Sequence, residues 1–521
     1  DGQFEHGAAA YEKRGTAVTV PTWNAEKCIQ CNQCAFVCSH ATIRPFLVSE
    51  DEIKAAPDNM KVADTKPKAS EYKFTMSVSP LDCMGCGECI TVCPAAAKGA
   101  LKMVPQESQA AEQPVFDYLV ATVGRKPGAP ADTTVKGSQF NQPLLEFSGS
   151  CAGCAETSYA RLITQLFGEH MYISNATGCS SIWGGPAATS PYTVNKDSKQ
   201  GPAWANSLFE DNAEFGYGMH LAYDTRRNVL ANNITSLIGL DAISEDMKAA
   251  LNAWLENKED AQKSEEAADA ILALLPEEKK TANGLSLELL ESIEARKDCL
   301  IKKSVWIVGG DGWAYDIGYN GVDHVLASGE DVNILVLDTE VYSNTGGQAS
   351  KSTPTGAIAK FAATGKRTKK KDLALLAMDY GYVYVAQVSM GADMNQVVKA
   401  FAEAEAYHGP SIIIAYAPCI NHGIKGGMDN SQMEMKKAVD CGYWQLFRYN
   451  PTLVGTDKAP LAIDSKEPTD DYQAFLMNET RYASLAKMNP DAAKVLFAKN
   501  EEDAAKKRAF YVKKAASYTE E

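Results

Sequence analysis

The sequence lacks a long hydrophobic run and an excess of basic residues. None of its apolar segments approaches the roughly eighteen residues that a membrane-spanning helix requires. The 51 Lys and Arg stand against 66 Asp and Glu, and the formal net charge of −15 argues against nucleic-acid binding as the main task. The first residues do not resemble a signal or transit peptide. We therefore expect a cytoplasmic protein without membrane or nucleic-acid partners. Since the chain starts at Asp1 and not at Met, we expect a processed product or a segment of something longer.

Cysteine is the residue type that the sequence has in unusual supply. The chain has 521 residues and 14 cysteines, and its hydrophobic content of 45% is that of an ordinary globular protein. Ten cysteines fall in three short segments, four at 28–38, four at 83–93 and two at 151–154. In a chain long enough for about three domains, this pattern points to metal sites in a reducing compartment more than to a disulfide framework.

The first two cysteine segments share one spacing. They read Cys28-x2-Cys31-x2-Cys34-x3-Cys38 and Cys83-x2-Cys86-x2-Cys89-x3-Cys93. In bacterial two-cluster ferredoxins this spacing lets three neighbouring thiolates bind one cluster, while the fourth binds the other. The predicted [4Fe–4S] ligand sets are Cys28, Cys31, Cys34 with Cys93, and Cys83, Cys86, Cys89 with Cys38. A pair of zinc sites is the alternative, but zinc motifs usually combine two separated Cys-x2-Cys units.

Two predicted strands near the middle of the chain each end in a polar loop. Residues 304–308 and 332–337 are short apolar runs, and a predicted helix at about 316–327 lies between them. This order fits a parallel crossover, which places both loops at the carboxyl ends of neighbouring strands, where open α/β sheets bind ligands.

The chemistry of these two loops suits a diphosphate held through a divalent cation. Asp311 offers a carboxylate, Thr339 a hydroxyl and Asn344 an amide oxygen, and Mg²⁺ prefers hard oxygen ligands. Gly310 and Gly312 let phosphate approach the backbone, next to the start of a helix. The alternative is an ordinary turn with solvated polar residues. The second strand, followed by Asn344, favours the cofactor site.

Two further cysteines follow predicted strands at this same edge. Strand 171–175 leads to Cys179, and strand 411–416 leads to Cys419. Cys151 and Cys154 lie at the start of a predicted helix that precedes strand 171–175. With Cys179 and Cys419 they form a predicted third four-thiolate site. The alternative is a redox dithiol plus two buried apolar cysteines. Cys299 and Cys441 have no cysteine neighbour in sequence, and we expect both to be structural.

We expect an α/β fold, a mostly parallel sheet with helices on both faces, preceded by a small α+β two-cluster domain. The predicted division is a connector at 1–24, the ferredoxin-like domain at 25–107, a linker at 108–144, the cofactor domain at 145–450 with a helical insertion at 196–300, and a helical tail at 451–521. The basic run at 366–371 predicts a solvated loop or, alternatively, a docking patch for an acidic partner or an anionic substrate. We assign no role to His408 or His422.

The motifs at 28–38, 310–318 and 338–348 together resemble the pyruvate:ferredoxin (flavodoxin) oxidoreductase family. The likeness runs from about Tyr11 to Trp444, and in its single-chain form that family is about twice as long. The resemblance implies the C-terminal half of such an enzyme. It also implies its reaction: pyruvate adds to thiamine diphosphate and loses CO₂, CoA takes the acetyl group, and electrons leave one at a time through three [4Fe–4S] clusters to ferredoxin or flavodoxin.

The resemblance also implies roles for particular residues. Asp311, Thr339 and the carbonyl of Val341 resemble Mg²⁺ ligands. Asn344 also resembles a residue close to pyruvate, although Thr345 stands where the family often has a second Asn. The implied thiamine diphosphate contacts are Glu156, Cys179, Gly310, Asp311, Gly312, Trp313 and the loop Thr339, Glu340, Val341, Tyr342, Ser343 and Asn344.

The resemblance implies partners that this sequence does not contain. The pyrimidine-binding and CoA-binding domains belong to the half that is missing here, and the complete enzyme is expected to be a homodimer. Two alternatives stay open. The chain could belong to an oxidoreductase for another 2-oxo acid, or it could be an electron-transfer subunit with a vestigial thiamine site.

Overall fold

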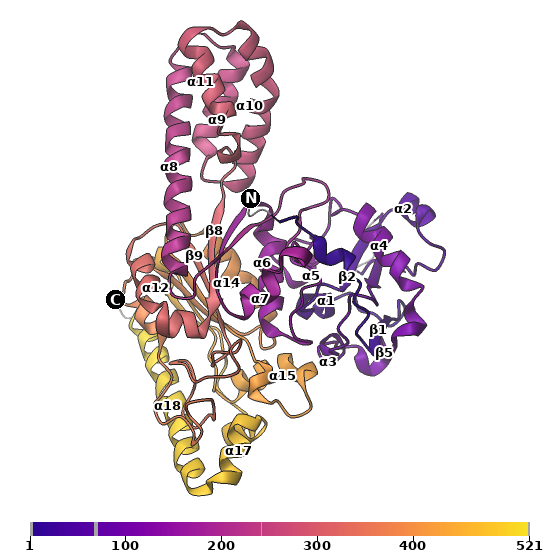
Figure 1. Cartoon of the computed structure of the whole chain (residues 1–521), viewed down its shortest axis with the longest axis vertical. Coiled ribbons are helices and arrows are strands. Elements are labelled where there is room, and N and C mark those ends of the chain that lie inside the picture. The colour runs from indigo at the N-terminus through magenta and orange to yellow at the C-terminus, as the bar shows by residue number, and fades with distance from the viewer. Residues whose placement is uncertain (1–3, 67–70, 241, 519–521) are drawn as a thin grey trace.

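The computed structural model describes residues 4–66, 71–240 and 242–518. Figure 1 shows a central sheet domain, a smaller domain beside it that contains the N-terminal cysteine motifs, and a bundle of helices that projects away from the sheet. Among the described residues, no helix is both long enough and apolar enough to cross a membrane.

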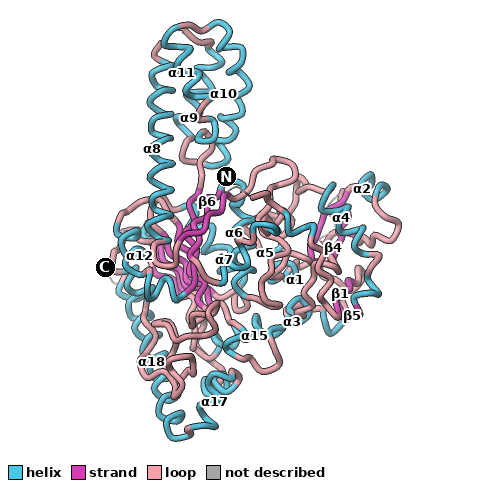
Figure 2. Tube along the Cα trace, viewed as in Figure 1, coloured by secondary structure: helices cyan, strands magenta, loops and turns pink. Residues whose placement is uncertain are grey.

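The strands of the central sheet are magenta in Figure 2. The sheet has eight strands in the order β13-β12-β10-β11-β9-β8-β6-β7. The six from β10 to β7 run parallel, and β12 and β13 are antiparallel, so the expected mostly parallel sheet is confirmed. Strands β9 to β11 are buried along their whole length, as parallel strands covered on both faces are. The strands are β6 Met171–Ala176, β7 Ala203–Ser207, β8 Ser304–Gly310, β9 Asn333–Asp338, β10 Tyr384–Val388, β11 Ser411–Tyr416, β12 Phe447–Tyr449 and β13 Leu461–Ile463.

The helix after β8 starts earlier than predicted. A π-helix at Gly312–Ile317 comes directly after Asp311 and leads into α12 at Tyr319–Ala327. Such wide turns are rare and are found mostly at functional sites. The other helices around the sheet are α6 Ala155–Phe167, α7 Cys179–Gly184, α13 Leu373–Met378, α14 Met394–Ala406, α15 Ser431–Asp440, α16 Tyr472–Met477, α17 Thr480–Met488 and α18 Pro490–Ser517.

The segment 451–521 differs from the appended tail that the sequence predicted. Its strand β13 pairs with β12 and extends the sheet. The Tyr511 ring of α18 stacks on Phe447 of β12 at a centroid distance of 4.6 Å. The polar composition of this segment did not predict its packing on the sheet, because a helix that covers a sheet needs apolar residues on only one face.

The small N-terminal domain begins before the predicted boundary at residue 25. Strand β1 pairs antiparallel with β5 on the far side of both cysteine motifs, so part of the expected connector belongs to this domain. The stretch between the two motifs forms a three-stranded antiparallel sheet in the order β2-β4-β3. The elements are β1 Thr19–Trp23, α1 Gln33–Val37, β2 Ile43–Val48, α2 Glu50–Ala55, β3 Ala63–Asp64, β4 Lys73–Val78, α3 Glu88–Thr91 and β5 Leu101–Pro105.

The segment 108–144 is also not the linker that its Pro and Gly content predicted. Helix α4 at Glu112–Thr122 buries Val115 and Leu119 in one cluster with Val48 of β2. Helix α5 at Val135–Ser138 contacts α1 and α6. The segment therefore fastens the two domains to each other.

The helical insertion begins later than residue 196, because β7 at 203–207 still belongs to the sheet. Its helices enclose a hydrophobic core that is separate from the core of the sheet, with Trp254 and Leu251 fully buried in it. Figure 1 shows α8 running from the sheet domain to the far end of this bundle. The helices are α8 Asn212–Ile238, α9 Glu245–Asn257, α10 Ala261–Thr281 and α11 Gly284–Glu294.

Candidate cofactor site and thiol clusters

Three oxygen atoms from the loops after β8 and β9 lie together at the carboxyl edge of the sheet. The hydroxyl oxygen of Thr339 is 3.0 Å from a carboxylate oxygen of Asp311 and 3.0 Å from the carbonyl oxygen of Val341. Adjacent ligands of an octahedral Mg²⁺ ion with bonds of about 2.1 Å lie about 3.0 Å apart. The spacing and the oxygen chemistry of this trio therefore fit three neighbouring positions around one Mg²⁺ ion.

Asp311 lies in an almost dry environment that favours a bound cation. Its side chain is buried, and Ser350 donates a hydrogen bond of 2.6 Å to its second oxygen. Burial, followed by the nearby carboxylate of Asp338, raises the pKa of Asp311 well above its usual value. Two buried carboxyl groups this close repel each other when ionised, so a divalent cation would relieve the repulsion.

The glycines on either side of Asp311 have different surroundings. A Cβ on Gly312 would lie 2.6 Å from the Tyr342 ring, so Gly312 lets the two loops meet. Gly310 has only the carbonyl oxygen of Leu337 near that position, at 3.9 Å, which leaves room on this side of the backbone. The indole N–H of Trp313 is buried and, among the described residues, has no hydrogen-bond partner. A buried donor without a partner is what a missing ligand or water leaves behind.

The rest of the second loop is open to solvent. Asn344 is exposed at the tip of a turn, and Gly346 and Gly347 close that turn with φ angles of +100° and +89°. The Ser343 hydroxyl lies 3.2 Å from the sulfur of Cys179, which brings the third thiol set to this loop.

The four cysteines predicted for the third cluster converge at the same edge. Burial raises the pKa of Cys419 to about 11, with a further contribution from the Cys151 thiol. Burial likewise raises the pKa of Cys179, and the thiols of Cys419 and Cys151 add to this effect. Mutual electrostatic effects of this kind require short distances, so residues far apart in the sequence form one thiol group here.

Glu156 lies beside this thiol group. The Trp183 indole donates a hydrogen bond of 2.9 Å to its carboxylate. Burial raises the pKa of Glu156 to about 7. Its position between the thiols and the cofactor loops is compatible with the predicted cofactor contact.

The eight cysteines of the N-terminal domain gather in the two crossed sets that their spacing predicted. Cys28, Cys31, Cys34 and Cys93 line one small cavity. Burial raises the pKa of Cys89 well above its usual value. The thiols of Cys86, Cys34, Cys83 and Cys38 raise it further, and all of these except Cys34 belong to its predicted set. Within the described ranges, no three His, Cys, Asp or Glu side chains are close enough to bind a single metal ion.

The thiol sets of the two domains are joined by buried polar contacts. Arg161 of α6 donates to the carbonyl oxygen of Cys38 at 2.9 Å. His40 is buried and its Nε2 atom lies 3.1 Å from the carbonyl oxygen of Ser150, one residue before Cys151. Thr91 of α3 donates to the carbonyl oxygen of Asp429 at 2.8 Å. The N-terminal domain is therefore fixed directly against the edge that holds the third set.

Glu340 differs from its predicted role as a cofactor contact. Its carboxylate accepts hydrogen bonds from Lys370 at 2.9 Å, and from Tyr443 and Arg481 at 2.7 Å each. Thr353 bonds to its carbonyl oxygen, and its own N–H bonds to Asp338. The backbone and side-chain polar groups of Glu340 therefore bond to other residues of the protein. This buried network holds the side chain away from the cofactor edge.

The basic run at 366–371 is neither a solvated loop nor simply an outward patch. Lys370 lies between Asp338 at 2.8 Å and Glu340 at 2.9 Å. Lys366 donates to the carbonyl oxygen of Ser350, and Lys371 to that of Tyr315. Three lysines of the run, Lys366, Lys370 and Lys371, therefore support the loops behind the candidate Mg²⁺ site, which composition does not reveal.

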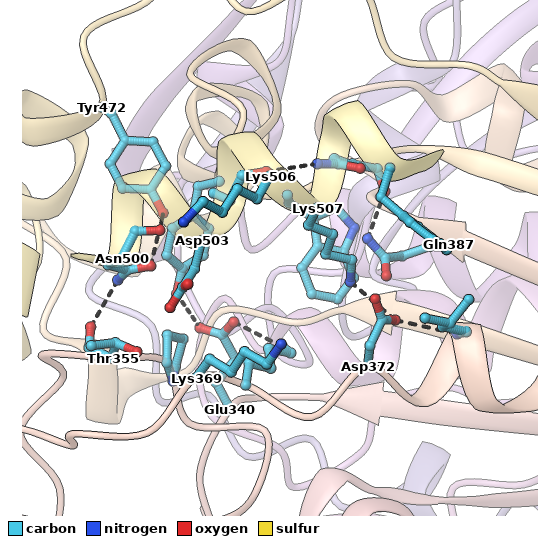
Figure 3. A pocket seen from close by; sticks show the side chains of 18 residues that line it. Glu340, Thr355, Lys369, Asp372, Gln387, Tyr472, Asn500, Asp503, Lys506 and Lys507 are labelled. Atoms are coloured by element: carbon cyan, nitrogen blue, oxygen red, sulfur yellow. Dashed lines mark hydrogen bonds and ion pairs between the residues drawn. The ribbon is translucent and has the colours of Figure 1, made fainter. Parts of the chain in front are cut away.

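Figure 3 shows a cavity of about 370 Å³ on the other side of this network. It lies between Glu340 and the covering helix α18, and its walls carry Lys369, Lys506 and Lys507. Of the described residues that line this cavity, only Glu340 was predicted to contact the cofactor. The cavity therefore backs the site and is separate from the oxygen trio.

Sequence reasoning missed three polar residues that support the trio, namely Ser350, His422 and Arg481. Ser350 lies in the Ser- and Thr-rich stretch 350–355, a composition that could have indicated a loop folded onto a carboxylate. His408, which also received no role, is exposed near Asp331. Cys299 and Cys441 are buried, as expected of structural residues.

Comparisons with known proteins agree with these sites. Residues 27–97 match the family described as 4Fe-4S dicluster domain, and residues 282–415 match the C-terminal TPP binding domain of thiamine pyrophosphate enzymes. Residues 226–282 match the insertion domain of pyruvate-ferredoxin oxidoreductase. The projecting bundle thus corresponds to a described module.

Several curated relatives match nearly the whole chain. A pyruvate:ferredoxin oxidoreductase from Moorella thermoacetica is 58% identical over 97% of this chain and 43% of its own length. A pyruvate-flavodoxin oxidoreductase from Klebsiella pneumoniae is 55% identical over 98% of this chain and 43% of its own length. A mitochondrial pyruvate dehydrogenase [NADP(+)] from Euglena gracilis is 46% identical over 95% of this chain and 27% of its own length. The chain thus spans less than half of the length of these relatives.

The dicluster match, the insertion match and the thiamine pyrophosphate match follow one another along a chain that these relatives cover almost completely. The chain belongs to the pyruvate:ferredoxin/flavodoxin oxidoreductases, as a C-terminal portion with the 4Fe–4S dicluster and the C-terminal thiamine pyrophosphate domain.

Proposed function

We propose that this chain is the diphosphate-binding and electron-transfer part of an enzyme that oxidises pyruvate with CoA to acetyl-CoA and CO₂. The observation that carries the proposal is the oxygen trio of Asp311, Thr339 and Val341 beside a four-thiol group on the same sheet edge. A cofactor held at the trio would sit next to a metal cluster that accepts its electrons.

The trio would hold Mg²⁺, and the ion would hold the diphosphate of thiamine diphosphate. The open side of Gly310 gives the phosphates access to the backbone. Thiamine diphosphate supplies an electron sink for decarboxylation when it is bound. Asn344, at the exposed tip of the loop, is the residue of this chain that we assign to contact with pyruvate.

Electrons would leave through three [4Fe–4S] clusters to ferredoxin or flavodoxin. The set of Cys151, Cys154, Cys179 and Cys419 is nearest to the cofactor loops. The contacts of Arg161 with Cys38, and of His40 with Ser150, bring the dicluster domain against this set. Such packing supports a continuous path from the cofactor edge to the N-terminal domain.

Completion of the active site requires a second part that packs on the carboxyl edge. Large apolar side chains are exposed after five of the parallel strands, and Phe361 is 93% exposed. Exposed apolar residues that follow the carboxyl ends of neighbouring strands would suit a protein contact at that edge. The partner we propose supplies the pyrimidine-binding and CoA-binding domains, in a complete enzyme that is a homodimer. The other exposed residues are Ile182 after β6, Leu208 after β7, Ile317 after β8 and Ile420 after β11.

The identity of the acceptor and of the 2-oxo acid depends on parts outside this edge. Relatives of similar likeness carry ferredoxin, flavodoxin and NADP(+) in their names. An electron-transfer subunit with a vestigial thiamine site would not need the intact trio around Asp311. A titration with thiamine diphosphate and Mg²⁺ separates the two possibilities, since only the enzyme part binds the pair.

The third cluster has a direct test in iron content. Anaerobically purified chain should hold about twelve iron atoms, four for each cluster. Cys419→Ala should lower the content to about eight, while Cys441→Ser and Cys299→Ser should leave it unchanged. A wild-type chain with about eight iron atoms would remove the cluster assigned to the sheet edge.

The reaction itself is tested with the complete enzyme. The chain is combined anaerobically with the polypeptide that supplies the remaining length of the relatives, together with Mg²⁺, thiamine diphosphate, pyruvate and CoA. We expect acetyl-CoA formation and ferredoxin reduction that depend on pyruvate and on Cys419. Reduction with another 2-oxo acid at a much higher kcat/KM would overturn the choice of pyruvate.

A further inference from the structure

A short segment before and at the start of α17 braces the loops of the candidate site. The N–H of Thr480 donates to the carbonyl oxygen of Gly423 at 2.9 Å, and the N–H of Lys425 donates to that of Asn478 at 2.9 Å. The N–H of Ile358 donates to the carbonyl oxygen of Arg481 at 2.9 Å. Residues 478–481 therefore hold both the loop after Cys419 and the loop that follows the cofactor turn.

His422 connects the braced loop to the oxygen trio. Its Nε2–H donates a hydrogen bond of 2.7 Å to the carbonyl oxygen of Thr339, whose hydroxyl is the centre of the trio. Its other ring nitrogen lies 3.5 Å from a carboxylate oxygen of Glu479, in the bracing segment. His422 and Glu479 are fully buried, so this contact is shielded from water. The imidazole is three residues after Cys419 and thus links the thiol loop with the Mg²⁺ loop.

Arg481 fixes the residue between the two candidate ligands Thr339 and Val341. Its guanidinium donates at 2.7 Å to Glu340 and at 2.7 Å to Glu479. Glu340 has a φ of +61°, a left-handed conformation that a residue with a side chain adopts only when its surroundings impose it. The Arg481 fork, with Lys370 on the other carboxylate oxygen, supplies those surroundings.

We propose that His422 and Arg481 are positioning residues that set the spacing of the Mg²⁺-binding trio, and thereby the alignment of the diphosphate with the third thiol set. This inference rests on the proposed function. It assigns a task to the C-terminal segment, which lies outside the matched thiamine pyrophosphate domain at 282–415. Groups that orient metal ligands from behind typically change metal affinity by about 10–100-fold when they are removed.

The test measures binding of Mn²⁺ with thiamine diphosphate to the anaerobic chain, in complex with the part that completes the enzyme. We expect Arg481→Met and His422→Phe to weaken binding by about 10–100-fold, with unchanged iron content. His422→Gln should restore much of the affinity, because its amide can still donate to the Thr339 carbonyl. Arg481→Lys should be intermediate, since an ammonium group cannot form the same fork with two carboxylates.

Arg448→Met is the matched control. Arg448 also bridges two carboxylates, Glu403 and Asp464, but it lies in β12, on the antiparallel side of the sheet. The Arg448→Met variant should have a melting temperature lowered to a degree similar to that of Arg481→Met. Its affinity for Mn²⁺ with thiamine diphosphate should be unchanged. Equal affinity in wild type and all variants, or an equal loss in Arg448→Met, would overturn the inference. A wild-type complex that binds no Mn²⁺–thiamine diphosphate would instead remove the proposed function beneath it.

Discussion

At the scale of single residues, Asp311 is the side chain on which the candidate cofactor site depends. It is the one carboxylate in the oxygen trio, and Thr339 and Ser350 both donate to it. The raised pKa that follows from burial and from Asp338 shows that its charge is poorly balanced by the protein alone. A cation would supply that balance.

Asp311→Asn keeps the size of the side chain and removes its charge. We expect the affinity for Mg²⁺ and thiamine diphosphate to fall at least tenfold, a change of about 1.4 kcal/mol or more, while the iron content stays the same. Calorimetric titration of the complex with its partner part, alongside iron analysis, checks this result. Asp224→Asn, on the exposed surface of α8, is the control. Unchanged cofactor affinity in Asp311→Asn would remove Asp311 from the ligand set.

A second residue makes the stability of the sheet sensitive to pH. Glu405 of α14 is half-buried and accepts hydrogen bonds from Ser304 at 2.6 Å, Trp306 at 3.1 Å and Asn333 at 3.3 Å. Burial raises its pKa to about 7 from an ordinary value of 4.5. Between these two values the folded chain holds a proton that the unfolded chain has lost, so the free energy of unfolding falls as the pH rises through this window.

Glu405→Gln should remove this part of the pH dependence. The variant should gain stability relative to wild type as the pH rises from 4.5 to 7, by an amount on the order of 3 kcal/mol at most. Melting temperatures measured anaerobically at pH 5 and pH 8 check the difference. Glu266→Gln, on the exposed side of α10, should show no such trend. A constant difference between wild type and Glu405→Gln at both pH values would contradict the raised pKa.

At the scale of elements, the projecting insertion is a unit with its own core. Trp254 fills that core, and its indole donates to the carbonyl oxygen of Leu300 at 2.7 Å. The described contacts between this core and the sheet run mainly through Tyr172 of β6 and the base of α8. A substitution that destabilises the core of the insertion should therefore leave the sheet domain folded.

Trp254→Ala should lower the free energy of unfolding of the insertion by roughly 3–5 kcal/mol. We expect faster hydrogen exchange throughout 245–294, while β8, β9 and the iron content remain as in wild type. Exchange measured by mass spectrometry on peptides from both regions checks this prediction. Leu285→Ala, at an exposed position, should leave exchange unchanged. An equal rise of exchange in β8 would show that the two cores unfold together.

At the scale of the whole molecule, we propose that the chain contributes one part of an active site. The trio and the thiol group face an edge with exposed apolar side chains, among them Phe361 and Ile420. Activation of the thiamine ring needs a positioned acid–base group, and we expect that group in the missing part. In the function that we propose, that part docks at the apolar edge.

The chain alone should not turn over pyruvate. With clusters intact and with pyruvate, CoA, Mg²⁺, thiamine diphosphate and a viologen dye present, we expect dye reduction far below roughly 1 s⁻¹. Addition of the completing part should raise the rate. Phe361→Glu in the completed enzyme should weaken the assembly, measured by analytical ultracentrifugation. Turnover at roughly 1 s⁻¹ or more by the chain alone would mean that it holds a complete site.

The sequence by itself determined the chemistry of the sites. Cysteine spacing predicted the two crossed sets at 28–38 and 83–93, because three ligands of each cluster lie within a few residues of one another. Strand-then-loop patterns predicted that Asp311 and Thr339 would meet, because parallel strands bring their carboxyl ends to one edge. The same reasoning brought Cys179 and Cys419 to that edge.

Only the tertiary structure decided what surrounds and supports these sites. Arg481 and Glu340 are 141 positions apart in the sequence and form an ion pair. Lys370 of the basic run forms an ion pair with a buried carboxylate. The segment after residue 451 contributes a strand to the sheet and is not an appended tail. Periodicity and composition describe neighbours along the chain. Long-range pairs such as these depend on which surfaces fold against each other, and no local pattern encodes that.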